Sequence, residues 1–396
     1  MPCPPPERAS ALAEALRPAW LSVDLDALRA NLGWLSERTG GAARMAVVKA
    51  NAYGHGAVEV SRALTAAGVE WFSVAMLEEA VELRRAGLES PILVFGALRP
   101  AQLPLVRKYR VTPSVVSLEQ LAMWREAAPS LGPVELHLKV DTGMTRLGID
   151  IKEMGEALAI LRGAPLLRLT GLMSHFADAD DLTSVRTADQ ERRFDDLVGA
   201  LDPSLRVGLM THLANSGGVL HRPPGTRGLV RLGLSLYGVD PARQIRDLVP
   251  VLSLAAEITL VREVPAGTRV GYGGRWTAAR PSRLAIVPVG YADGYPWRLG
   301  VGSEALVAGR RVPLAGSVSM DMLAVDVTGT GATVGDPVVL LGSQGEATIS
   351  VVELADRVGT IPYEILCLLG LRLPRRYLTA GRCLAERSPL LPGGGR

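Results

Sequence analysis

The sequence predicts the α/β fold class, with a (β/α)8 TIM-type barrel followed by a second, mostly β C-terminal domain. Short apolar runs alternate with amphipathic segments through the first two thirds of the chain, and eight such runs can be counted. After about Val249 the pattern changes to strand-like runs separated by Gly, Pro and Asp turns. A chain of 396 residues is long enough for two domains of this kind.

The first part of the chain favours a closed barrel over an open sheet. Alternating strands and helices imply parallel strands joined by crossover helices, and a (β/α)8 barrel requires eight of each. An open doubly wound sheet would use fewer strands and a glycine-rich dinucleotide turn, but the sequence has neither G-x-G-x-x-G nor a Walker A pattern. The apolar runs are 46–50, 71–75, 91–95, 111–116, 134–140, 169–175, 207–213 and 229–237, and helical spacing is found in 76–86, 117–128, 152–162 and 188–201.

The C-terminal part is expected to be mostly β. We expect a flexible extension at 1–18, the barrel at 19–249, the β domain at 250–385 and a disordered tail at 386–396. The strand-like runs are 255–264, 283–289, 304–307, 322–327 and 337–341, and one convincing helix is expected at 351–358.

Composition narrows the class of protein. Hydrophobic residues make up 48% of the chain and charged residues 21%, which is typical of a folded globular protein. The formal net charge is only +3 and its basic residues are mixed with acidic ones, so neither nucleic acid nor a membrane surface is expected as a partner. The 3 cysteines have no metal-ligand spacing, so no metal is expected and the compartment should be reducing. Without a signal-peptide pattern or a run long enough to cross a bilayer, a cytoplasmic location is expected.

Polar residues stand where the predicted barrel strands end, which is where (β/α)8 enzymes carry their active sites. Lys49 ends the first run, and burial would lower the pKa of its amine so that the neutral form could condense with an aldehyde. Taken singly, each candidate has an ordinary structural explanation, such as a snorkelling lysine or a hydrogen-bonded core histidine. Their shared location favours a functional site. The candidates are Lys49, Lys139, Asp141, Thr142, Arg146, His175, Ser216 and Arg231.

Six motifs carry a family resemblance, and they are VKANAYGHG at 48–56, DTGMTRLG at 141–148, HLANS at 212–216, VGYG at 270–273, GYADG at 290–294 and MD at 320–321. They resemble those of alanine racemases, fold-type III enzymes that depend on pyridoxal 5′-phosphate. The resemblance spans nearly the whole chain. It implies a homodimer, acting on a small amino acid, in which one subunit's barrel and the partner's β domain together form each active site. It also implies that the strand near residues 21–25 could join the β domain.

The resemblance implies two catalytic bases. Lys49 would hold the cofactor as an aldimine and act on one face of the substrate, while Tyr272 of the partner subunit would act on the other. Two bases suit racemisation because a proton leaves one face of a planar carbanion and returns to the opposite face. Tyr272 must then work as a phenolate, and His175 beside Arg231 could favour that anion.

Arg231 would contact the pyridine nitrogen of the cofactor. A guanidinium can only donate a hydrogen bond there, so the nitrogen stays unprotonated and the ring is a weaker electron sink. Related fold-type III decarboxylases place an acidic residue at that nitrogen. Arg231 therefore favours a racemase.

The binding residues follow from the same motifs. Arg146 would contact the cofactor's phenolate oxygen and the substrate carboxylate, which the backbone amide of the partner's Met320 would also bind. Lys139 matches a position that is often carbamylated in the family, and a carbamate would give Arg146 an anionic partner. The residues implied to hold the phosphate are Tyr53, Ser216, Gly233 and Tyr363, and the supporting residues are Lys139, Tyr291 and Asp321.

Two departures from the family pattern bear on the substrate. Ser317 and Trp297 stand where arginines usually line the substrate corridor, opposite an acidic residue matched here by Asp180, although Arg298 lies one place beyond Trp297. A less cationic corridor is therefore expected, which leaves strict preference for alanine open.

The leading hypothesis is an alanine racemase that supplies D-alanine for peptidoglycan. The alternatives are a racemase of broader range that accepts serine or basic amino acids, a fold-type III decarboxylase, and a non-catalytic pyridoxal phosphate carrier or inhibitor-sequestering protein. Arg231 disfavours the decarboxylase, and the β domain with Tyr272 disfavours the carrier.

Overall fold

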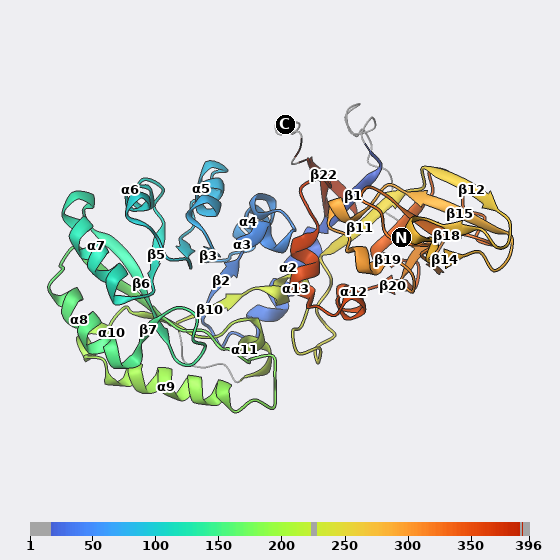
Figure 1. Cartoon of the computed structure of the whole chain (residues 1–396). Helices are drawn as coiled ribbons and strands as arrows, with labels where there is room; N and C mark the ends of the chain where they lie inside the picture. The colour runs from blue at the N-terminus through green and yellow to red at the C-terminus, as the bar shows by residue number, and fades with distance from the viewer. Residues whose placement is uncertain (1–16, 223–227, 389, 391–396) are drawn as a thin grey trace. The chain divides into compact units, whose positions relative to one another are not determined.

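The computed structural model describes residues 17–222, 228–388 and 390, and most of the predicted extension at 1–18 and of the predicted tail at 386–396 lies outside them (Figure 1). The first two residues of that predicted tail belong to a strand, β22 (Arg382–Arg387). The chain divides into two compact units. Unit 1 contains the described residues up to Ala27, the short segment Tyr53–Gly56 and the described residues from Pro250 onward. Unit 2 contains Leu28–Ala52 and the described residues between Ala57 and Val249. Each unit is described below by itself.

Unit 2 is the predicted barrel. Its strands pair in parallel from β10 through β2 to β9, and β7 (Ile149–Asp150) adds a short ladder to β6. The barrel is nearly closed, because the Arg231 amide at β10 donates to the Ala214 carbonyl just beyond β9, at 3.0 Å. The (β/α)8 prediction is therefore confirmed. The strands are β2 (Ala43–Val47), β3 (Trp71–Val74), β4 (Ile92–Val94), β5 (Thr112–Val115), β6 (Val134–Asp141), β8 (Leu167–Met173), β9 (Met210–His212) and β10 (Leu229–Leu232).

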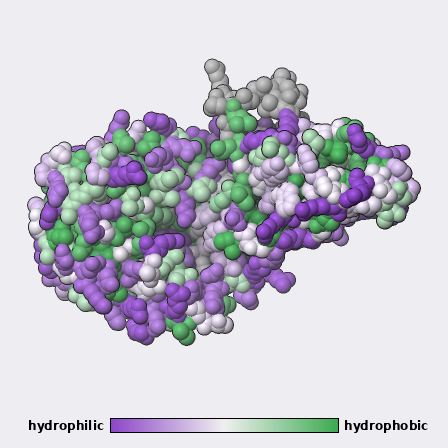
Figure 2. Space-filling model, viewed as in Figure 1, coloured by the Kyte–Doolittle hydropathy of each residue, from purple (hydrophilic) through white to green (hydrophobic). Residues whose placement is uncertain are grey.

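Helices surround these strands on the outside (Figure 1). Local capping fixes where they begin: the Ser117 hydroxyl accepts from the Gln120 amide at 3.2 Å at the start of α7. The charged face of α9 is exposed, and Figure 2 shows hydrophilic colouring over that edge of the barrel. The helices are α2 (Leu25–Ser36), α4 (Ala57–Ala66), α5 (Leu77–Arg85), α6 (Leu103–Lys108), α7 (Leu118–Leu131), α8 (Met154–Arg162), α9 (Arg186–Ala200), α10 (Pro203–Arg206) and α11 (Ser216–His221).

The barrel interior is filled by side chains. Met45, Leu93, Met173 and Leu229 come from four different strands, are almost wholly buried and form one cluster. Trp71, Phe95 and Met210 are partly buried against it. Because this packing occupies the interior, a ligand can bind only at an end of the strands.

Unit 1 is mostly β, as predicted. A long sheet runs in the order β17-β16-β19-β11-β1-β21-β22, with β20 paired to β19; β12-β15-β18 form a second sheet and β13-β14 a two-stranded ribbon. The first strand, β1, pairs with β11 and β21 and so lies within this unit. The strands are β1 (Ala19–Asp24), β11 (Leu252–Glu257), β12 (Leu260–Val264), β13 (Arg269–Val270), β14 (Trp276–Thr277), β15 (Ser282–Val287), β16 (Glu304–Val307), β17 (Arg310–Pro313), β18 (Leu323–Asp326), β19 (Pro337–Gln344), β20 (Ala347–Ile349), β21 (Arg375–Thr379) and β22 (Arg382–Arg387).

Several predicted boundaries differ from the structure. The predicted run 255–264 is two strands, β11 and β12, and residues 234–237 form a 3-10 turn, η3 (Leu234–Tyr237), not the end of a strand. The first barrel strand stops at Val47, before Lys49. Unit 1 also has a second helix, α13 (Pro362–Leu368), beside the predicted α12 (Val351–Val358). Pro362 suggests a turn in the sequence, but at the first position of a helix its missing N–H costs nothing.

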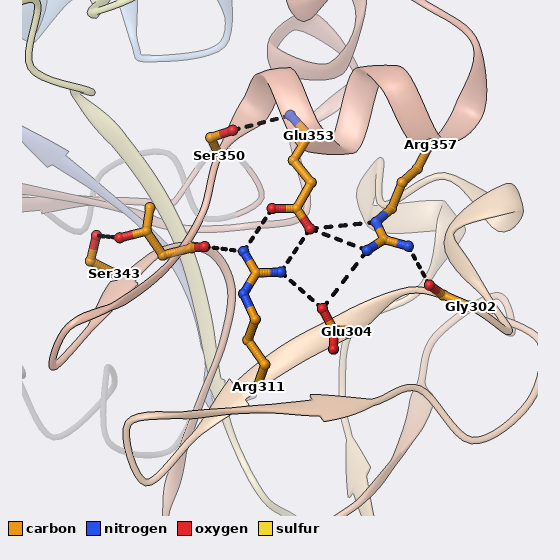
Figure 3. Close-up of polar contacts among 8 residues, drawn as sticks. Gly302, Glu304, Arg311, Ser343, Ser350, Glu353 and Arg357 are labelled. Atoms are coloured by element: carbon orange, nitrogen blue, oxygen red, sulfur yellow. Dashed lines mark hydrogen bonds and ion pairs between the residues drawn. The ribbon is translucent and has the colours of Figure 1, made fainter. Parts of the chain in front are cut away.

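An ion-pair network fastens α12 to the β16–β17 hairpin (Figure 3). Arg311 on β17 donates to both carboxylate oxygens of Glu353 on α12, at 2.9 and 2.8 Å, and to Glu304 on β16 at 2.9 Å. Arg357, one turn further along α12, lies 3.4 Å from Glu353. The Ser350 hydroxyl accepts from the Glu353 amide at 3.1 Å and begins the helix.

Within the described ranges, no helix combines the length and the apolar character needed to cross a membrane.

Candidate active site

Four cationic side chains gather at the carboxyl end of the barrel strands. Lys49 follows β2, Lys139 lies in β6, Arg146 lies in the loop after β6 and Arg231 lies in β10. Burial, followed by the charges of Arg146, Arg231 and Lys49, lowers the pKa of Lys139 to about 8 against the opposing effect of Asp141. Such a concentration of positive charge is costly by itself and fits an anionic ligand or a modified Lys139.

Arg231 is held rigidly inside the barrel. Its side chain is 2% exposed, and burial lowers the pKa of its guanidinium to about 9, which still leaves it charged at neutral pH. One terminal nitrogen donates to the His212 carbonyl at 3.0 Å, and the other to the carbonyls of Ser174 at 2.6 Å and Leu213 at 2.9 Å. These backbone acceptors fix the plane of the guanidinium.

The contacts of Arg231 set the tautomers of three histidines. Arginine can only donate, so His212 Nδ1 at 2.8 Å must accept. His175 Nδ1 at 3.1 Å accepts by sharing one of the two N–H groups that also face the Ser174 and Leu213 carbonyls. His212 then carries its proton on Nε2 and donates it to His137 Nδ1 at 2.9 Å. Burial, followed by the charge of Arg231, lowers the pKa of His137 to about 4 and takes the pKa values of His175 and His212 well below the ordinary value. All three rings are therefore neutral at pH 7.

Hydrogen-bond donors converge near the ends of β9 and β10. Ser216 Oγ accepts from the amides of Gly233 at 2.9 Å and Ser235 at 3.3 Å, and lies 2.9 Å from the Ser235 hydroxyl. Asn215 orients this turn by accepting from the Gly218 amide at 3.0 Å. Two hydroxyls and two backbone amides so close together are the donor set that a phosphate group requires.

The segment after Lys49 is a left-handed turn, not the continuation of a strand. Ala50, Asn51, Ala52 and Tyr53 have φ between 50 and 54°. L-residues disfavour this region by roughly 1–2 kcal/mol each, although Asn tolerates it. Side-chain contacts stabilise it: Glu79 accepts from the Ala50 amide at 2.6 Å, and Asn51 accepts from the Ala57 amide at 2.8 Å. The position of Lys49 is therefore set by a strained turn.

Six of the predicted site residues belong to unit 1. Tyr53 and Tyr363 have ring centroids 5.8 Å apart, with Tyr53 buried and Tyr363 on the first turn of α13. Burial raises the pKa of Tyr53, so its hydroxyl stays protonated and available as a donor. Tyr272, by contrast, is 77% exposed and lies in η4 (Tyr272–Gly274), between β13 and β14.

Tyr291, Met320 and Asp321 lie together in unit 1. The Tyr291 amide donates to Ser319 O and the Ala292 amide to Met320 O, both at 3.0 Å. The buried carboxylate of Asp293 binds the tip of this turn by accepting from the Gly290 amide at 2.9 Å. Around it, Arg17 donates to Asp293 at 2.7 and 2.8 Å, and Arg372 donates to Asp321 at 2.8 Å. The loop that carries Met320 is thus held by paired charges.

The family follows from comparison with known proteins. The sequence model of the alanine racemase N-terminal domain matches residues 23–241, and that of the alanine racemase C-terminal domain matches residues 251–377. The chain belongs to the alanine racemase family. The resemblance found in the motifs is therefore confirmed, and the chain is an isomerase of this family.

Individual relatives match over nearly their whole length. The alanine racemase of Halothermothrix orenii is 39% identical over 368 residues, which cover 91% of this chain and 97% of that protein. The structure of alanine racemase from Bacillus anthracis with bound L-Ala-P has a TM-score of 0.88 at 34% identity and covers 95% of this chain and 98% of the other. The biosynthetic alanine racemase of Pseudomonas aeruginosa has a TM-score of 0.81 at 40% identity, with coverage of 92% and 100%.

Sequence reasoning missed two sets of residues that contact the predicted ones, one set in each unit. His137 and His212 have no predicted role, yet Arg231 donates a hydrogen bond to His212, which in turn donates one to His137. A signal for His137 was present, because it precedes Lys139 and Asp141 at strand spacing on the same face of β6. No sequence signal indicates that Arg17 and Arg372 bind Asp293 and Asp321.

The barrel residues fit pyridoxal phosphate, the cofactor implied by the resemblance. The donor cluster at Ser216 suits its phosphate, the cation cluster suits its anionic oxygens, and Lys49 supplies an amine. Among the residues that the structure describes, no group of three or more His, Cys, Asp and Glu side chains is arranged to hold a metal ion.

Proposed function

We propose that this chain interconverts L-alanine and D-alanine with pyridoxal 5′-phosphate as cofactor. We further propose that it acts in the cytoplasm and supplies D-alanine for peptidoglycan. Membership of the alanine racemase family supports the reaction. The observation that carries the cofactor assignment is the fixed, donor-only guanidinium of Arg231 among neutral histidines. A decarboxylase of related fold would instead need an acidic group at this position.

The barrel supplies most of the proposed cofactor site. Lys49 would hold the cofactor covalently, Arg231 would donate to its ring nitrogen, and Arg146 would bind its phenolate oxygen. His175, by accepting from Arg231, would keep that guanidinium in place. Pyridoxal phosphate, when bound, supplies an electron sink that acidifies the α-hydrogen of an attached amino acid. The phosphate would be held by Ser216 and the Gly233 amide, together with the hydroxyls of Tyr53 and Tyr363.

Two groups would move the proton. The Lys49 amine would remove or return the α-hydrogen on one face of the substrate, and the Tyr272 phenolate would do so on the other. Arg146 and the Met320 amide would hold the substrate carboxylate, so that the α-carbon stays between the two bases. Tyr291 and Asp321 would support the Met320 loop.

A homodimer is the proposed assembly. Tyr272 and Met320 lie in unit 1, and Lys49 and Arg146 in unit 2. As the resemblance implies, unit 1 of one subunit would complete the barrel site of its partner. The proposal also includes Lys139 as a carbamate, because an anion there would offset the charges of Arg146 and Arg231 that now oppose its ammonium.

One experiment tests the reaction directly. Holoenzyme incubated with L-alanine in deuterated water should yield D-alanine labelled at Cα, and Lys49→Ala should abolish both the product and the visible absorption of the bound cofactor. If neither exchange nor inversion occurs, the racemase proposal is wrong.

A broader amino-acid racemase is the second candidate. Ser317 and Trp297 replace arginines usual in the family. Without those two positive charges and long side chains, the corridor would exclude larger or basic amino acids less strongly. Repeating the assay with serine, lysine and arginine separates the two, since a strict alanine racemase would leave those amino acids unlabelled.

A further inference from the structure

Tyr272 stands on a loop whose own backbone does little to fix it. Gly271, Gly273 and Gly274 surround it, with φ values of 68, 70 and 51°. Gly271 combines this φ with ψ −169°, a conformation essentially restricted to glycine. Because Tyr272 itself is 77% exposed, packing of its ring within the described chain does not hold the loop either. Something else must orient a side chain proposed to move a proton.

Two arginines flank this loop. Arg269 on β13 donates to the Gly273 carbonyl at 3.0 Å and lies 3.5 Å from the Gly274 carbonyl. On the other side, the guanidinium carbon of Arg275 lies 4.7 Å from the ring centroid of Trp297. A cation over an indole face is an attractive contact. The loop is therefore held at its base by Arg269 and at its far end by the Arg275–Trp297 stack.

Trp297 is well placed to serve as a platform. It begins η6 (Trp297–Leu299), whose Leu299 is fully buried. The ribbon and this turn share Gly316 as a neighbour: a Cβ on Gly316 would come within 3.1 Å of Val270 O, and one on Gly300 within 3.0 Å of Gly316 O. The turn that carries Trp297 is thus packed close to the start of the β13–β14 ribbon, which carries Tyr272.

We propose that Trp297 is a positioning residue for Tyr272, acting through Arg275. The inference rests on the proposed role of Tyr272 as the second base. It is particular to this chain, because the arginine that the family pattern places at 297 would repel Arg275 and could not offer it an aromatic face. Trp297 in this chain therefore replaces a corridor cation with a support for the catalytic loop.

The test uses the different demands of exchange and inversion. Inversion needs both Lys49 and Tyr272, whereas exchange of the α-hydrogen without inversion needs only the base on one face. When Tyr272 is poorly placed, the enantiomer deprotonated by Lys49 returns more often to its starting configuration carrying solvent deuterium. The ratio of exchange to inversion in deuterated water is measured on the holoenzyme with each alanine enantiomer. For the enantiomer that Lys49 deprotonates, a rise in this ratio reports on a misplaced Tyr272.

Trp297→Ala should raise that ratio about two- to fivefold, the range expected for a partly exposed cation–π contact. Trp297→Phe should restore most of the wild-type ratio, because phenylalanine keeps an aromatic face. Arg275→Gln breaks the same contact from the other side and should match Trp297→Ala. Trp297 is 47% exposed, so its truncation opens no buried cavity. As a matched control, Arg38→Gln removes an arginine that lies 3.3 Å above the Trp34 ring and should leave the ratio unchanged.

The outcomes separate this inference from the function on which it rests. If Tyr272→Phe racemises at the wild-type rate, Tyr272 is not the second base and the proposed mechanism fails. If Tyr272→Phe stops inversion while Trp297→Ala and Arg275→Gln keep the wild-type ratio, only the positioning role is overturned. A loss of exchange and inversion in equal proportion would also overturn it, since that pattern indicates a merely structural residue.

Discussion

Gly171 leaves room for the ring of His137. Adding a single methyl group there tests the histidine chain, by which we mean the hydrogen bonds that run from Arg231 through His212 to His137. A Cβ at Gly171 would lie 2.4 Å from Cδ2 and Cγ of His137 and 2.5 Å from Nδ1. Ordinary contacts begin at 3.4 Å, so the ring would have to retreat by roughly 1 Å. It has nowhere to go, because His137 is completely buried and packs against Trp71, with ring centroids 5.4 Å apart.

The cost of Gly171→Ala has two parts. Overpacking a filled interior costs about 1–3 kcal/mol. Displacing His137 also removes the acceptor for the buried His212 N–H, which adds about 1–3 kcal/mol. We expect the free energy of unfolding to fall by about 4 kcal/mol, a large part of the stability of an ordinary domain. Urea denaturation followed by circular dichroism measures it.

Gly199→Ala provides the control. Gly199 lies in α9, where an added Cβ would meet nothing within 4 Å, so the same chemical change should stabilise the helix by about 1 kcal/mol. The two variants should therefore shift stability in opposite directions. A Gly171→Ala protein within about 0.5 kcal/mol of wild type would refute the contact between β6 and β8 on which the histidine chain depends.

Three other changes have defined outcomes. The pKa of His137 is about 4 when folded and 6.5 when unfolded, so the unfolded state binds more protons between these values. This residue alone should lower stability by about 3 kcal/mol as the pH drops from 6.5 to 4, and His175 and His212, whose pKa values are also lowered, should add to the fall. A flat stability profile over that window would contradict this burial. Glu353→Gln removes the carboxylate shared by Arg311 and Arg357 and should lower the free energy of unfolding by about 1 kcal/mol in low salt. The loss should shrink in about 1 M NaCl because salt screens the ion pairs, and thermal melts at the two ionic strengths would measure it. Ser317→Arg restores the arginine usual in the family, and Ser317 lies close to Tyr272, because its backbone nitrogen would be 3.8 Å from a Cβ on Gly271. This change should alter the KM for alanine, most clearly at low ionic strength, and an unchanged KM would remove the corridor argument.

The periodicity of the sequence was sufficient to predict the architecture. Eight apolar runs separated by amphipathic segments gave the barrel because strand and helix periods are local properties of the chain. Boundaries were less accurate where a local signal has two meanings. Pro362 is compatible with either a turn or the first position of a helix, and only its packing in unit 1 selects the helix.

Site residues could be predicted where they belong to a contiguous sequence motif. Contacts between residues far apart in the sequence could not. Lys49, Arg146 and Arg231 are conspicuous as charges at strand ends. The 2.9 Å contact of His137 with His212 joins residues 75 positions apart, and no local pattern contains such a pairing. Likewise, Arg17 and Asp293 are 276 positions apart, so their ion pair becomes visible only after the sheets of unit 1 have formed.

The left-handed turn after Lys49 has a consequence for chirality. Mirror-image residues prefer the φ values that L-residues avoid, so Ala50, whose φ is 52° and whose side chain is exposed, occupies a backbone conformation natural to D-alanine. A protein assembled by chemical ligation with D-alanine at position 50 should keep its fold and lose the local strain. A chain proposed to make D-alanine thus contains, next to the lysine proposed as its catalytic base, a place in its own backbone where that enantiomer would be the better building block.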